Sequence, residues 1–141
     1  MFSKAILVAL TAALGVVASP APIQAAELDA RAPAASPTVK FCTAANFGGI
    51  CINAPVVSDS CTSFTGGLTT LNEEVSSAVV PAGFICTLFS QFGCTTADPA
   101  NSDQDQVALT GGSYANFKTL QGINGAINYN DKTSSFSCSP L

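Results

Sequence analysis

Two six-residue segments carry the side chains in this chain that are best suited to hold a metal ion. Residues 72–77 read Asn-Glu-Glu-Val-Ser-Ser, and residues 130–135 read Asn-Asp-Lys-Thr-Ser-Ser. In the second segment Asn130, Asp131 and Ser134 supply side-chain oxygen atoms, and the carbonyl of Lys132 can supply another. Hard oxygen atoms of these kinds are the ligands that Ca²⁺ prefers, at about 2.3–2.6 Å. The two segments therefore predict calcium chemistry.

The same segments also have a purely structural interpretation. Asn-Glu and Asn-Asp pairs are common turn formers, because their side chains hydrogen-bond to nearby backbone. The paired serines could form the polar face of a strand. Both interpretations stay open, with calcium binding favoured. A further acidic stretch, Asp98 with Asp103 and Asp105, lacks the Gly and the distal Glu of an EF-hand, so we interpret it as a solvated loop.

The residue types argue against catalysis. The chain contains no His, which excludes Ser-His-Asp and Cys-His pairs and His-ligated zinc. The Gly-x-Ser-x-Gly motif is absent, and no second set of carboxylates has the spacing that glycoside hydrolysis needs. We therefore expect a protein that is not an enzyme, with no catalytic residues.

Composition restricts the possible partners. The 141 residues include 9 acidic and 5 basic ones, so the formal net charge is −4 and no basic run occurs. This balance argues against nucleic acid and against an anionic membrane surface as the partner. Because only 10% of the residues are charged and 48% are hydrophobic, the chain can collapse into a core.

The N-terminal residues are typical of an export signal. Lys4 precedes an apolar run over residues 5–17 that is too short to span a bilayer, so residues 1–18 are predicted to be a signal peptide. Residues 19–37 are rich in Ala and Pro and are interpreted as a pro-segment or linker. The stretch ending at Arg31 resembles the sites at which fungal secreted proteins lose a propeptide. We expect a secreted, extracellular protein without membrane insertion, whose folded domain spans residues 38–141.

The cysteines are expected to form three disulfides. All of them lie after the linker and their number is even, which in an oxidising compartment favours structural pairing. Fifteen connectivities are possible from the sequence alone. The preferred set joins Cys42 to Cys51 and Cys86 to Cys94, each across a hairpin, and leaves Cys61 to pair with Cys138.

The remaining pattern is that of short strands and turns. Apolar and β-branched runs over residues 39–43, 75–80, 84–89, 105–109 and 134–138 alternate with Gly, Asn, Asp, Ser and Pro clusters. Pro81 is expected to end the second of these runs. No window shows a helical apolar period, so an all-β sandwich is predicted.

An internal repeat suggests a duplicated domain. The stretch Cys-Thr, a few polar residues, Phe-Gly and Cys begins at Cys42 and again at Cys86. Thr-Gly-Gly occurs at residues 65–67 and again at residues 110–112. Each copy is followed by one of the two six-residue segments that begin with Asn, residues 72–77 and residues 130–135.

These blocks resemble the βγ-crystallin family, in which paired Greek-key motifs each contain a hairpin of the form aromatic-x4-aromatic-x-Gly and a later Asn/Asp-Asn/Asp-x-x-Ser/Thr-Ser stretch. Residues 130–135 match that stretch completely, and residues 72–77 depart from it only at Glu73. Residues 46–49 look like the family's hairpin turn, although Cys42 stands where an aromatic is usual. The second hairpin, when aligned on Cys86, is one residue longer than the first. Gly93 directly follows Phe92 there, so it does not occupy the Gly position of the family pattern. The resemblance covers residues 39–138.

The resemblance implies an all-β fold in which two Greek-key motifs form one disulfide-stapled β-sandwich. It also implies two calcium sites, each of which takes ligands from both motifs. Carried over by position, the metal ligands are Asn72, Glu73, Glu74 (by its carbonyl), Ser76, Asn130, Asp131, Lys132 (by its carbonyl) and Ser134. Few formal charges per site predict weak binding, micromolar or poorer. Ser77 and Ser135 are expected to brace the loops by hydrogen bonding.

The function expected from this resemblance is a secreted calcium-binding protein with a structural or stress-protective role. The alternative is a secreted antimicrobial, killer-toxin-like or host-directed effector protein, because small killer toxins are known to use this fold. A third possibility is a self-assembling surface coat, because the chain resembles hydrophobins in size and expected secretion. The chain has six cysteines, however, whereas hydrophobins have eight. The sequence does not identify an extracellular protein or cell-wall partner.

Overall fold

The computed structural model describes residues 36–122 and 125–141 of the chain. The predicted signal peptide lies outside the described residues, as does the predicted pro-segment apart from residues 36 and 37. Within the described residues, no helix is long and apolar enough to cross a membrane.

The described chain is built mainly of antiparallel strands. The larger sheet has the order β2-β1-β4-β8-β3, and β5 also pairs with β4. Its strands are β1 (Thr38–Ala44), β2 (Gly48–Pro55), β3 (Cys61–Ser63), β4 (Ser77–Phe89), β5 (Gln106–Tyr114) and β8 (Ser135–Pro140). A second sheet pairs β6 (Leu120–Gly122) with β7 (Gly125–Ile127). Three 3₁₀ helices complete the described elements: η1 (Gly66–Leu71), η2 (Pro99–Gln104) and η3 (Phe117–Thr119). The all-β prediction is confirmed.

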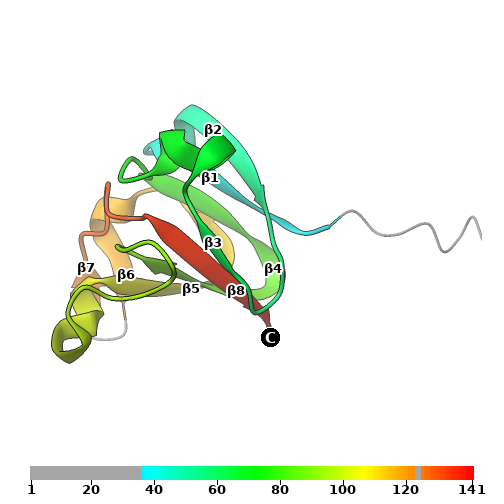
Figure 1. Cartoon of the computed structure of the whole chain (residues 1–141). Helices are drawn as coiled ribbons and strands as arrows, with labels where there is room; N and C mark the ends of the chain where they lie inside the picture. The colour runs from blue at the N-terminus through cyan, green and yellow to red at the C-terminus, as the bar shows by residue number, and fades with distance from the viewer. Residues whose placement is uncertain (1–35, 123–124) are drawn as a thin grey trace, which may run out of the picture. The chain divides into compact units, whose positions relative to one another are not determined.

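Strand β4 connects the two halves of the larger sheet. Its first residues, Ser77–Val79, pair with β1, and Phe84–Phe89 pair with β8 (Figure 1). Strand β5 pairs with both parts of β4. The sheet can therefore curl so that the two halves share one core.

The expectation that Pro81 ends a strand was wrong. Residues 77–80 of the first predicted strand and all of the second, residues 84–89, belong to the single strand β4, which runs through Pro81. The register with β5 shifts between Val80 and Ile85, so Pro81 lies in a bulge, where a missing N–H costs no ladder hydrogen bond. Gly111 of β5 lies opposite this bulge, and a Cβ there would come within 2.8 Å of Ala82 Cα. Glycine is needed at that position because the two backbones approach closely.

Aromatic rings fill the centre of the core. Phe41, Phe64 and Phe136 are buried, and the Phe41 ring lies edge-on to the other two at centroid distances of 5.3 and 5.1 Å. Such edge-to-face packing is a favoured aromatic geometry. These phenylalanines therefore pack the core, whereas the Phe92 side chain is 51% exposed.

Tyr129 is a buried tyrosine that links the segment after β7 to β4 and to the residue before β5. Its hydroxyl is 2.8 Å from the carbonyl oxygen of Asp105 and 3.2 Å from that of Leu88, and it can donate to these acceptors. Burial and, to a smaller extent, the negative charge of Asp105 raise the pKa of Tyr129 above its ordinary value. The phenol therefore stays protonated and keeps its donor hydrogen.

The three expected disulfides are present, but two of the expected pairings were wrong. Cys42 pairs with Cys51 as predicted, because the two face each other across the β1–β2 hairpin. The other bonds join Cys86 to Cys138 and Cys61 to Cys94. Cys86 lies inside β4 directly opposite Cys138 of β8, with Cα atoms 4.0 Å apart, so it cannot close a hairpin with Cys94. Cys94 lies beyond the end of β4 and links that loop to β3.

Candidate metal centre

The two hexapeptides that begin with Asn form loops that pair with each other. We call residues 72–77 the first loop and residues 130–135 the second loop. The N–H of Glu73 donates to the carbonyl of Thr133 at 2.9 Å, and the N–H of Asp131 donates to the carbonyl of Val75 at 3.1 Å. The second residue of each loop thus contacts the fourth residue of the other. This exchange gives the pair an approximate twofold symmetry.

The turn in each loop is made by an equivalent residue. Glu73 has φ 56° and Asp131 has φ 57°, both in the left-handed region. Asp adopts this conformation more readily than most residues, since its short carboxylate can bond to nearby backbone, whereas Glu lacks this advantage. The single departure of the first loop from the family pattern therefore lies at a conformationally demanding position, and its backbone nevertheless follows the second loop.

Oxygen atoms from both loops meet around Asp131. The Ser76 hydroxyl of the first loop donates to Asp131 Oδ1 at 3.2 Å, and the Asn130 amide donates to Asp131 Oδ2. Asn72 Oδ1, the oxygen atom of the side-chain amide, is buried and has no hydrogen-bond partner in the described part of the chain. Polar oxygen atoms buried in this way are costly unless something binds them.

The structure places all eight predicted ligand residues on the paired loops. The side chains of Ser76 and Ser134 are buried, and those of Asn72 and Asn130 are partly buried. The side chains of Glu73, Glu74, Asp131 and Lys132 are exposed. Over residues 36–122 and 125–141, no three His, Cys, Asp or Glu side chains gather into a metal-binding group. Any ion held here would therefore depend largely on amide, hydroxyl and carbonyl oxygen atoms, which fits a hard cation bound weakly.

The last serine of each loop braces the hairpin of its own motif, as expected. The Ser77 hydroxyl donates to the Ala44 carbonyl at 2.7 Å and accepts from the Phe47 N–H at 3.1 Å. The Ser135 hydroxyl donates to the Gln91 carbonyl at 2.6 Å and accepts from the Cys94 N–H at 2.9 Å. Both serines are fully buried, so each hydroxyl replaces water for two backbone groups.

These bonds correct the alignment of the two hairpins. They make Ala44 equivalent to Gln91 and Phe47 equivalent to Cys94, and therefore Cys42 equivalent to Phe89 rather than to Cys86. The backbone agrees, because φ is positive at residues 46 and 47 and again at residues 93 and 94. Each hairpin thus has one aromatic and one Cys at the two aromatic positions of the family pattern. Aligning the chain on Phe89, instead of on matching cysteines, would have revealed this.

The Thr-Gly-Gly block is not a true repeat. Residues 65–67 lie at the start of η1, whereas residues 110–112 lie within β5. The structural counterpart in that region is Phe64 with Phe117, because each donates its N–H to the carbonyl of the fifth residue in a loop, Ser134 and Ser76 respectively. Three residues of common type matched by chance.

Thr133 offers a stability test of the loop pairing. Thr133 occupies the fourth position of the second loop and is equivalent to Val75 in the first loop. Both side chains are fully buried. Thr133 Oγ1 has no hydrogen-bond partner in the described part of the chain. We expect Thr133→Val to raise the free energy of unfolding by about 1 kcal/mol, because it removes an unsatisfied buried hydroxyl at nearly constant volume. Denaturant unfolding measures the change. The reverse exchange, Val75→Thr, should be destabilising, and a destabilised Thr133→Val would show that the hydroxyl has a partner.

The acidic stretch from Asp98 to Asp105 is held by local bonds. The Asp98 carboxylate accepts from the Ala100 N–H at 2.9 Å, which caps η2, and an Asp105 carboxylate oxygen accepts from the Asp98 N–H at 3.1 Å. These carboxylates shape the loop before β5, which agrees with the interpretation of this stretch as a loop rather than an EF-hand.

Comparison with known proteins identifies the fold. No protein-family model matches the chain, and no curated protein matches it. A βγ-crystallin from Ciona intestinalis superposes with a TM-score of 0.51 at 20% identity, covering 71% of this chain and 96% of that one. The N-terminal domain of Protein S gives 0.51 at 16% identity, with 74% and 97% covered, and an archaeal βγ-crystallin gives 0.50 at 17%, with 73% and 98% covered. The chain is therefore βγ-crystallin-like in its fold.

Proposed function

We propose that this is a secreted, non-enzymatic protein that binds calcium at the paired loops and serves a structural or stress-protective role outside the cell. The observation that carries the proposal is the meeting of Ser76 from the first loop with Asp131 from the second, at 3.2 Å. A cation held by both oxygen atoms would connect the two Greek-key motifs directly. Binding of such an ion would stabilise the folded domain.

The available oxygen atoms support two sites of mixed origin. Asp131, Asn130 and the Lys132 carbonyl would act together with Ser76, while Glu73, Asn72 and the Glu74 carbonyl would act together with Ser134. The buried Asn72 Oδ1, which has no hydrogen-bond partner among the described residues, supports the first loop as part of a site. The longer side chain of Glu73 makes the site to which it contributes the weaker of the two.

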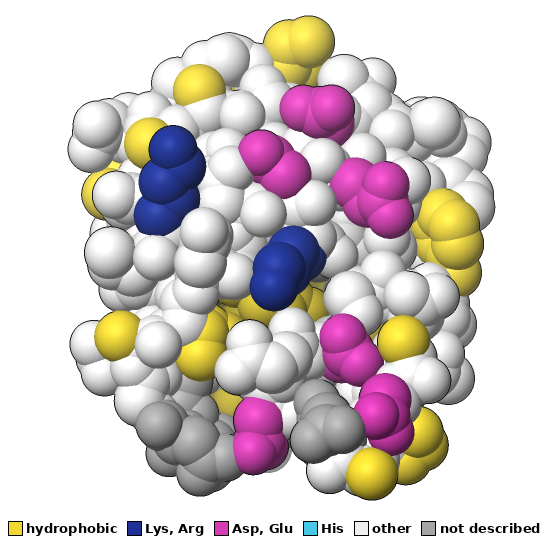
Figure 2. Space-filling view, turned by 90° about the vertical axis from the view of Figure 1, so that its left-hand side faces the viewer, with side chains coloured by type: hydrophobic (Ala, Val, Ile, Leu, Met, Phe, Trp, Pro, Cys, Tyr) yellow, Lys and Arg dark blue, Asp and Glu magenta, His cyan; other side chains and the backbone are white. Residues whose placement is uncertain are grey.

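The extracellular part of the proposal rests on the cysteines. All six are paired in three disulfides, which fit an oxidising compartment. Figure 2 shows a face on which acidic and basic side chains are interspersed, without a basic patch of the kind that nucleic acid attracts. We therefore propose an extracellular role without a nucleic-acid partner.

Thermal unfolding of the oxidised protein in EDTA and across a calcium titration tests this proposal. At a calcium concentration tenfold above the dissociation constant, ligation should add about 1.4 kcal/mol to the free energy of unfolding, and the midpoint should keep rising with concentration. Asp131→Ala and Ser76→Ala should each reduce the calcium response, because they remove oxygen ligands from the two sides of one site.

Glu74→Gln is the matched control. It removes a negative charge from the first loop but leaves the Glu74 carbonyl, which is the proposed ligand, in place. An unchanged calcium response in this variant would separate ligation from general charge screening. A midpoint that ignores calcium up to millimolar concentrations would reduce both loops to structural turns, and an effector or toxin role would then be the better hypothesis.

A further inference from the structure

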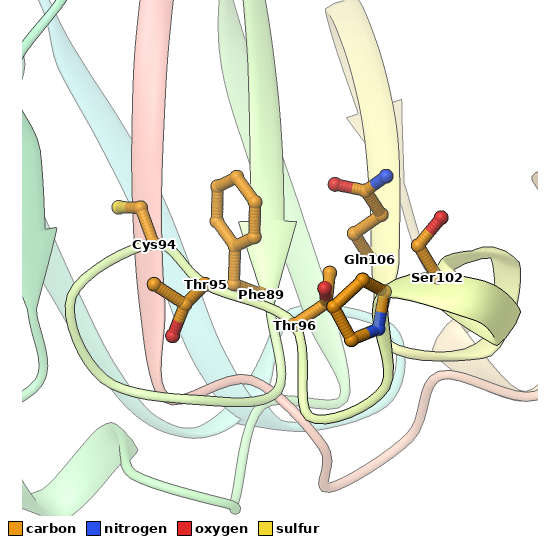
Figure 3. Close-up of a pocket in the computed structure, with 7 residues that line it drawn as sticks. Phe89, Cys94, Thr95, Thr96, Ser102 and Gln106 are labelled. Atoms are coloured by element: carbon orange, nitrogen blue, oxygen red, sulfur yellow. The ribbon is translucent and has the colours of Figure 1, made fainter.

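An uncharged pocket lies at the end of β4 and β5, with walls that contain none of the proposed metal ligands. Its volume is about 540 Å³, within the range of about 300–1,000 Å³ that small-molecule sites occupy. Phe89 from β4 and Gln106 from β5 are cross-strand partners, so their side chains lie on the same face of the sheet. Figure 3 shows the Phe89 ring and the Gln106 carboxamide rising beside each other along the two strands.

The other walls supply hydroxyl groups together with small apolar groups. Thr95 and Thr96 come from the loop after β4, and Ser102 and Pro99 come from η2; the Cys94 side chain completes the lining. No Asp, Glu, Lys or Arg side chain lines the pocket. An aromatic ring surrounded by hydroxyl and carboxamide groups can stack against the C–H face of a neutral ligand and hydrogen-bond to its hydroxyls.

An exposed aromatic residue lies on the loop that forms one wall. Phe92 is 51% exposed and precedes Cys94 and Thr95 by two and three residues. The Phe92 ring is therefore accessible to a ligand that binds against this loop.

The walls are held in place before any ligand arrives. The disulfide between Cys61 and Cys94 ties the loop to β3, and the Gly93 N–H donates to the Ser63 hydroxyl at 3.0 Å. On the other side, the Tyr129 hydroxyl is bonded to the carbonyl of Asp105, the residue before Gln106. A preorganised pocket loses less conformational entropy when a ligand binds.

We propose that this pocket binds a neutral saccharide unit of an extracellular glycan, with Phe89 and Phe92 stacking on the sugar and Gln106, Thr96 and Ser102 bonding to its hydroxyls. Charged ligands are disfavoured because the walls offer no opposite charge and the chain carries a net charge of −4. Strongly apolar ligands are disfavoured because hydroxyl and carboxamide groups would lose water without gaining partners.

Titration of the isotope-labelled oxidised protein in EDTA, followed by two-dimensional amide NMR, tests the proposal independently of calcium. The probes are cellotetraose and tetra-N-acetylchitotetraose, with tetragalacturonate as an anionic molecule of similar size. Saturable shifts at the amides of Thr95, Thr96 and Gln106 are expected with at least one neutral probe. Tetragalacturonate should bind at least tenfold more weakly, and equal binding would overturn the neutral-ligand assignment.

Variants of one aromatic residue and one polar residue locate the site. Phe92→Ala and Gln106→Ala should each weaken binding by about tenfold, as expected for one stacked ring or one buried hydrogen bond. Ile50→Ala on β2 is the matched control, because Ile50 is 56% exposed and β2 is not paired with β4 or β5. The same spectra show whether each variant is folded. Failure of both neutral probes to give saturable shifts at millimolar concentration, or equal losses in Ile50→Ala and Phe92→Ala, would overturn the proposal.

Discussion

Replacing Cys86 and Cys138 together by Ala should lower the free energy of unfolding by about 4 kcal/mol. The bond joins residues separated by 52 positions, so its loss greatly increases the conformational freedom of the unfolded chain. Both cysteines are buried, and they connect the middle of β4 to β8, where the second half of the larger sheet is assembled. This disulfide should be the most stabilising of the three.

The comparison with the hairpin disulfide makes the prediction specific. Cys42 and Cys51 are separated by only 9 positions, and the β1–β2 pairing already holds them together. Removing that pair by Ala substitution should cost about 2.6 kcal/mol by the same loop-closure argument. Denaturant unfolding of the two double variants, with their remaining disulfides intact, gives both values. If the hairpin variant lost more stability than the Cys86 and Cys138 variant, loop closure would not explain how the disulfides act.

Ser77→Ala and Ser135→Ala should each lower the free energy of unfolding by about 2 kcal/mol. Each substitution leaves one backbone carbonyl and one backbone N–H without the hydroxyl that now joins them, and an unsatisfied buried group costs about 1–3 kcal/mol. The hairpins of the two motifs are equivalent, so the two losses should be similar. Equal effects at residues 58 positions apart would support the structural duplication.

The control for these variants is Ser113→Ala. Ser113 lies in the same sheet, on β5, but its side chain is exposed, so its removal should change stability by less than about 0.5 kcal/mol. Chemical denaturation of all three variants measures the difference. A loss at Ser77 or Ser135 no greater than that at Ser113 would mean that water replaces the hydroxyl and that the brace contributes little.

Local patterns in the sequence were sufficient for the class of fold and for the candidate loops. Short β-branched runs that alternate with turn residues predicted an all-β chain. The two hexapeptides that begin with Asn predicted the two loops that pair in the structure. These predictions succeeded because strand propensity and turn chemistry depend on neighbouring residues. The role of Ser77 and Ser135 also followed from their position in the loops.

Matches between short segments misled the alignment of the repeat. Cys42 and Cys86 share a following Thr, but one lies beside a hairpin turn and the other lies inside β4, opposite Cys138. The true counterpart of Cys42 is Phe89, and an aromatic residue replaced by a Cys cannot be aligned by residue type. Positive φ values and hydroxyl bonds to the backbone reveal the equivalence, and both belong to the folded chain.

The sequence by itself therefore determined the all-β class, the two loops and the even set of cysteines. Only the tertiary structure decided which cysteines pair, how β4 passes Pro81, and that Ser76 meets Asp131 although the two are 55 positions apart in the sequence. The physical reason is that a strand's partners and register depend on the joint burial of distant apolar residues such as Phe41, Phe64 and Phe136. Local sequence patterns do not contain this information about strand pairing. The pocket beside Phe89 therefore could not be predicted from the sequence, because its lining residues come together only in the folded chain.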